Sequence, residues 1–250
     1  MILYGSSYTE VVGSGLSGSG IGISCFHFND ETGELKLLNS IKNRNSGYFC
    51  ISKNSQNLYS FQEVMKDKNP VVIAFEIQKD FSLKKINELP ISGGLPCHIS
   101  LVENDSMITV ACYETGSVHL FSLDENSGFK AEIQVIQHAG KSVNEVRQEA
   151  PHAHQIVTFN QTYFVPDLGI DAIKAYKLST TFFEERYSIE IPKGEGPRHL
   201  VFHPSGKFGF SMNELTGTIS LLKLIDNEFK VTDLISSLPE NYKGAPSVRP

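Results

Sequence analysis

The stretch PRHLVFHPSGKFGFSMNELTGTISLL, residues 197–222, contains the pattern that decides the fold. Two apolar segments flank the polar turn HPSGK at 203–207, and after a second turn at 215–218 the residues alternate between apolar and polar as far as Leu222. Alternation with a period of two between glycine-containing turns is typical of β-hairpins. The stretch therefore predicts three antiparallel strands, and the more charged residues that follow it predict a fourth.

The same plan recurs along the chain, and each repeat begins with a short opening motif. The openings are Pro96-Cys97-His98-Ile99-Ser100, His152-Ala153-His154-Gln155-Ile156 and Pro197-Arg198-His199-Leu200-Val201, with a weaker fourth at 46–52. When the openings are aligned on Tyr48, His98, His154 and His199, the spacings are 50, 56 and 45 residues. The longest spacing includes residues 141–150, which we interpret as a loop inserted between two units.

This repetition predicts an all-β protein, a β-propeller built from four-stranded antiparallel blades. A single sheet of this kind cannot bury both of its faces, so successive units must stack on one another. About five units are predicted within a single domain of residues 1–250, at roughly 1–43, 44–91, 92–137, 151–192 and 196–238. Residues 244–250 are similar to the opening of a sixth unit.

The composition argues against several classes of protein. The 22 basic and 28 acidic residues give a net charge of −6, which does not favour nucleic-acid binding, and no apolar run is long enough for a membrane-spanning helix. The first residues follow a strand pattern rather than that of a signal peptide. Because the four cysteines lack a CxxC spacing, we expect reduced thiols and no metal. No cofactor is expected, and with neither a secretory nor a membrane segment predicted, the expected location is the cytoplasm.

Two local patterns imitate functional motifs. Residues 13–18, GSGLSG, match the dinucleotide fingerprint G-x-G-x-x-G, but the alternating segment 21–28 that follows predicts a strand where that fingerprint requires a helix. We therefore expect a turn between two strands. His199 and His203 are four residues apart, as in many metal sites, yet on a strand this spacing separates them by about 13 Å. They cannot share one metal ion.

A cluster of polar residues at the unit starts is the better candidate for a site. Propellers gather the starts of their innermost strands at one end of a central channel, which would bring His152, His154 and Arg198 together. Glu214 ends the antiparallel second strand, so it returns to the same end. The same residues could instead be channel-lining polar groups that contact only water, and the residue pattern leaves both interpretations open.

Four motifs in this region resemble those of the seven-bladed-propeller lactonases. Residues 147–154 resemble R-Q-x-x-P-H-x-H, residues 166–171 are similar to P-D-L-G-x-D, residues 196–204 resemble G-P-R-H-x-x-F-H-P, and residues 213–215 match N-E-L. That family includes a bacterial 6-phosphogluconolactonase and the fungal 3-carboxy-cis,cis-muconate lactonizing enzyme. The resemblance implies seven blades and a further arginine from a later blade, so we expect a propeller that is incomplete at its C-terminus.

The resemblance also implies the functional residues. It places the catalytic groups at His154, Arg198 and Glu214, and it makes Arg147, Gln148, His152, His199 and Asn213 candidates for binding substrate. Histidine suits a base or proton shuttle, and arginine suits an oxyanion or carboxylate. Glu214 would orient one of these two residues or serve as the base itself.

The function that the resemblance implies is hydrolysis of an anionic sugar-acid lactone, with 6-phosphogluconolactone as the expected substrate. No partner other than this small molecule is expected, and neither nucleic acid nor a membrane. Two alternatives remain: a muconate-type lactonizing cycloisomerase that uses the same residues, and a non-catalytic propeller that binds a partner. The chain has no tryptophan, which counts against a scaffold of the WD type.

Overall fold

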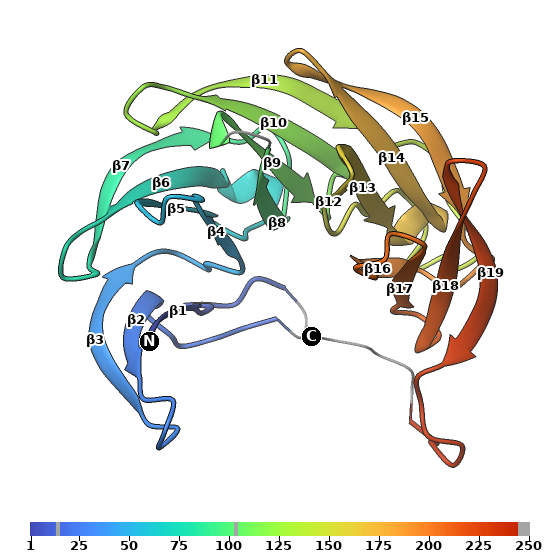
Figure 1. The fold of residues 1–250 in the computed structure, drawn as a ribbon, viewed down its shortest axis with the longest axis horizontal. Coiled ribbons are helices and arrows are strands. Elements are labelled where there is room, and N and C mark those ends of the chain that lie inside the picture. The colour runs from blue at the N-terminus through green and yellow to red at the C-terminus, as the bar shows by residue number, and fades with distance from the viewer. Residues whose placement is uncertain (14–15, 103–104, 245–250) are drawn as a thin grey trace. The chain divides into compact units, whose positions relative to one another are not determined.

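The computed structural model describes residues 1–250 except 14–15, 103–104 and 245–250. In this described part the strands form one three-stranded and four four-stranded sheets, and in each sheet the strands lie in sequence order (Figure 1). The strands are β1 (Ile2–Ser6), β2 (Gly22–Phe28), β3 (Leu35–Lys42), β4 (Phe49–Ile51), β5 (Asn57–Phe61), β6 (Val71–Ile77), β7 (Leu83–Pro90), β8 (Pro96–Leu101), β9 (Met107–Cys112), β10 (Ser117–Leu123), β11 (Phe129–Gln137), β12 (Val157–Phe159), β13 (Thr162–Asp167), β14 (Ala172–Ser179), β15 (Phe182–Glu190), β16 (Pro197–Phe202), β17 (Phe208–Asn213), β18 (Thr218–Ile225) and β19 (Glu228–Ser236).

The predicted all-β repeat is confirmed, with one difference. The sheets β4–β7, β8–β11, β12–β15 and β16–β19 coincide with the last four predicted units, and each has the four predicted strands. The first sheet has three described strands rather than four, in the order β1-β2-β3, with β1 paired to β2. The residues 141–150 contain neither helix nor strand, as expected for a loop between units.

A β-bulge that recurs in four sheets supports the repeat independently of sequence motifs. The pairing register shifts at equivalent places, where the last two strands of each sheet meet, at Cys25/Phe26, Ala74/Phe75, Ala175/Tyr176 and Leu221/Leu222. A bulge bends the strand and increases its right-handed twist. The recurrence therefore gives the long outer strands a similar local twist in each of these sheets.

The chain divides into two compact units, and the boundary runs through the sheet β8–β11. The first unit contains residues 1–110 and 119–133, and the second contains 111–118 and the residues from 134 onward. The core of the first unit includes Ile23, Leu58, Ile73 and Phe75. The core of the second includes Phe164, Ile173, Ala175, Ile189, Ile191, Leu200, Leu222 and Phe229.

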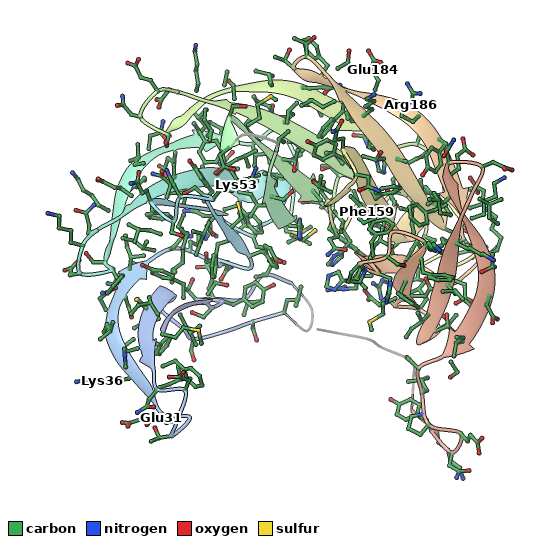
Figure 2. The ribbon with its side chains drawn as sticks, viewed as in Figure 1. Glu31, Lys36, Lys53, Phe159, Glu184 and Arg186 are labelled. Carbon is green, nitrogen blue, oxygen red and sulfur yellow. The ribbon has the colours of Figure 1, made fainter. Side chains whose placement is uncertain are left out.

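In the second unit, apolar side chains lie between neighbouring sheets and charged side chains lie on the outer strand. Phe159 on β12 stacks on Phe202 of β16 with ring centroids 4.5 Å apart, so it joins two neighbouring sheets. Glu184 and Arg186 on β15 are exposed and point outward from the outer strand (Figure 2). Apolar side chains thus close the space between sheets, while the charged outer strand faces solvent.

Two segments considered above fall partly outside the described residues. Ser14 and Gly15 of the GSGLSG segment lie outside them. Gly13 and Leu16 pair with each other in an isolated β-bridge, within the connection from β1 to β2. Strand β2 follows this segment, as predicted, where a dinucleotide fingerprint would need a helix. Residues 245–250, most of the predicted sixth opening, also lie outside the described part.

The described residues contain no helix long and apolar enough to cross a membrane. Within the same residues, no group of histidine, cysteine, aspartate and glutamate side chains is arranged to hold a metal ion.

Candidate active site

The second unit brings together the candidate residues from four segments of the chain. Arg147 lies on the inserted loop, His152 and His154 lie on the extended segment before β12, Arg198 lies on β16, and Glu214 directly follows β17. Strands β16 and β17 are antiparallel and pair Pro197 with Asn213. This register explains how residues 16 positions apart in sequence can meet.

Glu214 forms the centre of the site because it binds two arginines. Arg147 Nη2 donates to Glu214 Oε1 at 2.8 Å, and Arg198 Nη1 donates to Glu214 Oε2. The Glu214 side chain is only 7% exposed and that of Arg198 only 17%, whereas Arg147 is 42% exposed. The two guanidinium groups and one carboxylate leave one excess positive charge, which favours an anionic ligand.

The two arginines also decide the ionisation of Glu214. Burial raises the pKa of this carboxyl group, but the Arg198 charge and the hydrogen bonds from both arginines outweigh burial and bring the pKa below its ordinary value. Glu214 is therefore a carboxylate at neutral pH and a weak base. Of the roles considered for it, the geometry favours orienting Arg198 over accepting a proton from water.

The lowered pKa of Glu214 predicts how stability depends on pH. A carboxyl group whose pKa is lower in the folded state contributes stability above its unfolded pKa and loses it as the pH falls through the folded value. We expect the difference in unfolding free energy between wild type and Glu214→Gln to be constant above the ordinary value of 4.5 and to shrink below it. Urea unfolding between pH 3 and 7 measures this difference. The exposed Glu184→Gln is the control, and a wild-type advantage that grows on acidification would contradict the prediction.

Tyr113 is a site residue that the sequence analysis missed. Its ring stacks on His152 with centroids 4.4 Å apart and an interplanar angle of 9°, and it meets the edge of His154 at 5.9 Å. Arg147 Nη2 donates to the Tyr113 hydroxyl at 3.1 Å. Burial raises the pKa of Tyr113 despite the nearby Arg147, so the hydroxyl stays protonated and can donate to a ligand oxygen.

The repeat contains a signal that could have identified Tyr113. Its turn reads Y-E-T-G and the turn after β17 reads E-L-T-G, so Gly116 corresponds to Gly217 and Tyr113 corresponds to Glu214. Both glycines have positive φ angles, 57° and 67°, which confirms that the two turns have the same conformation at this position. The sheets β8–β11 and β16–β19 contribute different chemistry at this position, but the equivalent residue contacts the same cluster in both.

Two imidazoles complete the cluster beside Arg198. The rings of His154 and His199 lie with centroids 5.1 Å apart, and the side chain of His154 is nearly buried. Burial and the Arg198 charge lower the pKa of His199, although Glu214 opposes them. His199 is therefore neutral at neutral pH. His152 has a different environment, because its Nδ1 hydrogen bonds to the backbone carbonyl of Tyr113 at 2.9 Å.

Gln148 and Asn213, both predicted to bind substrate, are completely buried. The side chain of Gln148 donates to the Leu168 carbonyl at 2.9 Å and accepts from the Asn144 N–H at 3.1 Å. Asn213 Nδ2 lies 2.9 Å from the hydroxyls of both Thr218 and Ser220. The geometry therefore favours a structural role for both residues: Gln148 shapes the inserted loop and Asn213 shapes the turn that carries Glu214.

Comparison with known proteins decides the family. A family model described as a lactonase with a seven-bladed β-propeller matches residues 3–248. The chain belongs to this lactonase family. The 6-phosphogluconolactonase of Bacillus subtilis is 32% identical over 245 residues, which cover 95% of the chain and 69% of that protein. The 6-phosphogluconolactonase of Formosa agariphila is 30% identical over 238 residues, or 90% of the chain and 67% of that protein.

Solved structures with the same fold agree. The crystal structure of a candidate 6-phosphogluconolactonase from Bacteroides fragilis has a TM-score of 0.87 at 26% identity, covering 96% of the chain and 68% of that protein. The periplasmic gluconolactonase of Pseudomonas aeruginosa has a TM-score of 0.85 at 22% identity, covering 98% of the chain and 70% of that protein, and it supports the fold alone. The resemblance drawn from the four motifs is thereby confirmed at the level of family and fold.

Proposed function

We propose that this lactonase-family chain hydrolyses a sugar-acid lactone, with 6-phosphogluconolactone as the substrate and 6-phosphogluconate as the product. The observation that carries the proposal is the buried carboxylate of Glu214 held between Arg147 and Arg198, beside the imidazole pair His154 and His199. The names of the two relatives with 30–32% identity point to the same reaction.

In the proposed mechanism, His154 removes a proton from a water molecule whose oxygen attacks the lactone carbonyl carbon. The carbonyl oxygen becomes an oxyanion, and the Arg198 guanidinium stabilises it. When the tetrahedral intermediate collapses, the bond between the carbonyl carbon and the ring oxygen breaks. The ring oxygen takes up the proton from His154 and leaves as a hydroxyl group. The new carboxylic acid then releases the second proton of the water to solvent, so the product is a carboxylate.

Substrate binding falls to the more exposed side of the cluster. Arg147 keeps part of its guanidinium accessible, and it lies beside the Tyr113 hydroxyl and the His152 ring. We assign Arg147, His152 and Tyr113 to the phosphate and hydroxyl groups of the substrate, because guanidinium groups bind phosphate oxygens through paired hydrogen bonds. His199 lies closer to the reacting atoms, next to His154 and Arg198.

A substrate panel tests the reaction. Purified protein should release 6-phosphogluconate from 6-phosphogluconolactone well above the spontaneous rate, and it should leave 3-carboxy-cis,cis-muconate unchanged. Turnover of the muconate alone would instead support the cycloisomerase, which uses the same residues to move a proton to or from carbon. Absence of turnover with both compounds would contradict the catalytic proposal and favour a binding propeller.

We further propose that the reaction takes place in the cytoplasm as a step of the pentose phosphate pathway. None of the four cysteines forms a disulfide in the part of the chain that the structure describes, which is consistent with a reducing compartment. The acidic net charge of −6 agrees with a small-molecule substrate rather than nucleic acid. Fractionation of cells that produce a tagged chain tests the location, and recovery outside the cytoplasmic fraction would contradict it.

A further inference from the structure

We propose that Asp167 and Asp171 are positioning residues for the proposed catalytic groups. Asp167 holds the segment that carries the two histidines, and Asp171 holds the segments that carry the two arginines. The inference rests on the proposed function, because it assigns a role in that reaction to a segment that never touches the substrate. Both aspartates are completely buried, and the short 3-10 helix η3 (Leu168–Ile170) separates them.

Asp167 holds the segment that carries the two histidines. Its Oδ1 accepts hydrogen bonds from the backbone N–H groups of His152, at 2.7 Å, and of Gly169, at 3.0 Å. The adjacent Leu168 N–H donates to the His152 carbonyl at 3.1 Å. The backbone of His152 is therefore bound on both sides by one turn, and its ring has little freedom to leave Tyr113.

A buried relay fixes the second oxygen of Asp167. His138 Nδ1 lies 2.6 Å from Asp167 Oδ2, and the Tyr176 hydroxyl lies 2.9 Å from His138 Nε2. Burial raises the pKa of Tyr176, so the phenol keeps its proton. A neutral His138 ring that donates from Nδ1 to the Asp167 carboxylate accepts the Tyr176 hydroxyl proton at Nε2. The His138 backbone N–H also donates to the Gly116 carbonyl at 3.1 Å, which connects the relay to the turn of Tyr113.

Asp171 holds the segments that carry the arginines. Its Oδ2 accepts from the Ser142 hydroxyl at 2.5 Å and from the Gly194 N–H at 2.7 Å. Its Oδ1 accepts from the Gly196 N–H at 2.8 Å. Ser142 begins the inserted loop of Arg147, and Gly196 lies two residues before Arg198. One carboxylate therefore connects the two segments whose guanidinium groups must meet at Glu214.

Gly169 lets this turn lie directly against the inserted loop. A Cβ atom at position 169 would come within 1.8 Å of the Ala150 carbonyl oxygen, a distance that no side chain tolerates. The turn thus supports the loop from residue 150, while Asp171 supports it from Ser142. Because both aspartates are buried and their oxygens are occupied by these contacts, we expect them to act through the groups they hold.

Two isosteric variants test the inference. An asparagine replaces one acceptor oxygen of the aspartate with an NH2 donor. In Asp167→Asn this NH2 group would point at the His138 N–H, which is also a donor. In Asp171→Asn it would point at the N–H of either Gly194 or Gly196. We expect kcat to fall by about tenfold or more and KM to rise in Asp167→Asn, because the segment that Asp167 holds carries both the proposed base His154, whose misplacement is costly, and His152, which is assigned to substrate binding. In Asp171→Asn we expect KM to rise together with the loss of kcat, since both arginines are displaced.

The matched control is Asp124→Asn in the first unit. Asp124 also accepts two backbone N–H groups in a turn, from Asn126 and Gly128, so it controls for the general cost of altering such a turn. Its kcat and KM should equal those of wild type. Folded Asp167→Asn and Asp171→Asn proteins with wild-type kcat and KM would overturn the inference.

A second measurement separates this inference from the proposed function. Nitrogen-15 NMR of the histidine side chains reports the environments of His152, His154 and His199 without any substrate. Shifted imidazole signals in Asp167→Asn support the positioning role even if the wild type fails to hydrolyse every lactone tested, and unchanged signals overturn it. If Asp167→Asn does not fold, Tyr176→Phe takes its place, because this change removes only the hydroxyl at the end of the relay. Unchanged His138 and His152 signals in Tyr176→Phe would then contradict the proposed role of the relay.

Discussion

Replacing Arg198 with alanine should lower kcat/KM for lactone hydrolysis by about 10²–10³-fold, the usual cost of losing one oxyanion donor. The Arg198 side chain is largely buried and is oriented by Glu214, so its charge acts in an environment that screens it weakly. Its Nε is buried and has no hydrogen-bond partner among the described residues. The guanidinium has further N–H groups besides the Nη1 bond to Glu214, and these can donate to a substrate oxygen. Steady-state kinetics with 6-phosphogluconolactone measure the effect.

Two further variants make the Arg198 prediction specific. Arg198→Lys keeps the positive charge but loses the planar fork, so it should recover only a small part of the rate. Arg186→Ala removes an exposed arginine from the outer strand β15 of the same unit and should leave kcat/KM unchanged (Figure 2). Wild-type kinetics in Arg198→Ala would contradict the assignment, and equal losses in Arg186→Ala would show that the effect is not local.

The fold could be predicted from the sequence because each repeat contains the residue patterns of β-hairpins. Alternation and glycine turns are local signals, and repetition in several units makes each occurrence more reliable than it would be alone. The three-stranded first sheet could not be predicted in this way, since the periodic pattern says nothing about which strands find a partner. The recurring bulges were also missed, because an extra residue in one strand changes register without changing the alternation enough to be noticed.

The sequence predicted that the central residues of the candidate site converge, but it did not predict the contacts at the edges of the cluster. His154, Arg198 and Glu214 were expected to converge; Glu214 binds Arg198 directly, and the His154 ring lies 5.1 Å from the ring of His199, the residue after Arg198. Gln148 was assigned to substrate because it belongs to a motif, but a motif does not say which side of the chain a side chain faces. Tyr113 was missed for the opposite reason: it lies outside every family motif, although its turn aligns with the turn of Glu214 in the repeat.

The identity of the base leads to the second large effect. Two imidazoles lie together beside Arg198, and either could in principle take a proton from water. His154→Gln should lower kcat by about 10²-fold or more, within the range expected for loss of a general base. His199→Gln should lower kcat less, because His199 lies next to the base rather than being the base. His203→Gln, an exposed turn histidine bound to Ser205, is the matched control and should behave as wild type.

The pH dependence of kcat distinguishes the two histidines independently of the size of the loss. Because the pKa of His199 is lowered from 6.5 by burial and by Arg198, a rate controlled by His199 would persist on acidification to a pH below 6.5. If His154 is the base, the fall in kcat at low pH, the acid limb of the pH profile, disappears in His154→Gln and remains in His199→Gln. If the limb instead disappears only in His199→Gln, His199 takes the proton and His154 orients it. Arg198 then has two effects, since the charge that stabilises the oxyanion also keeps the neighbouring base unprotonated.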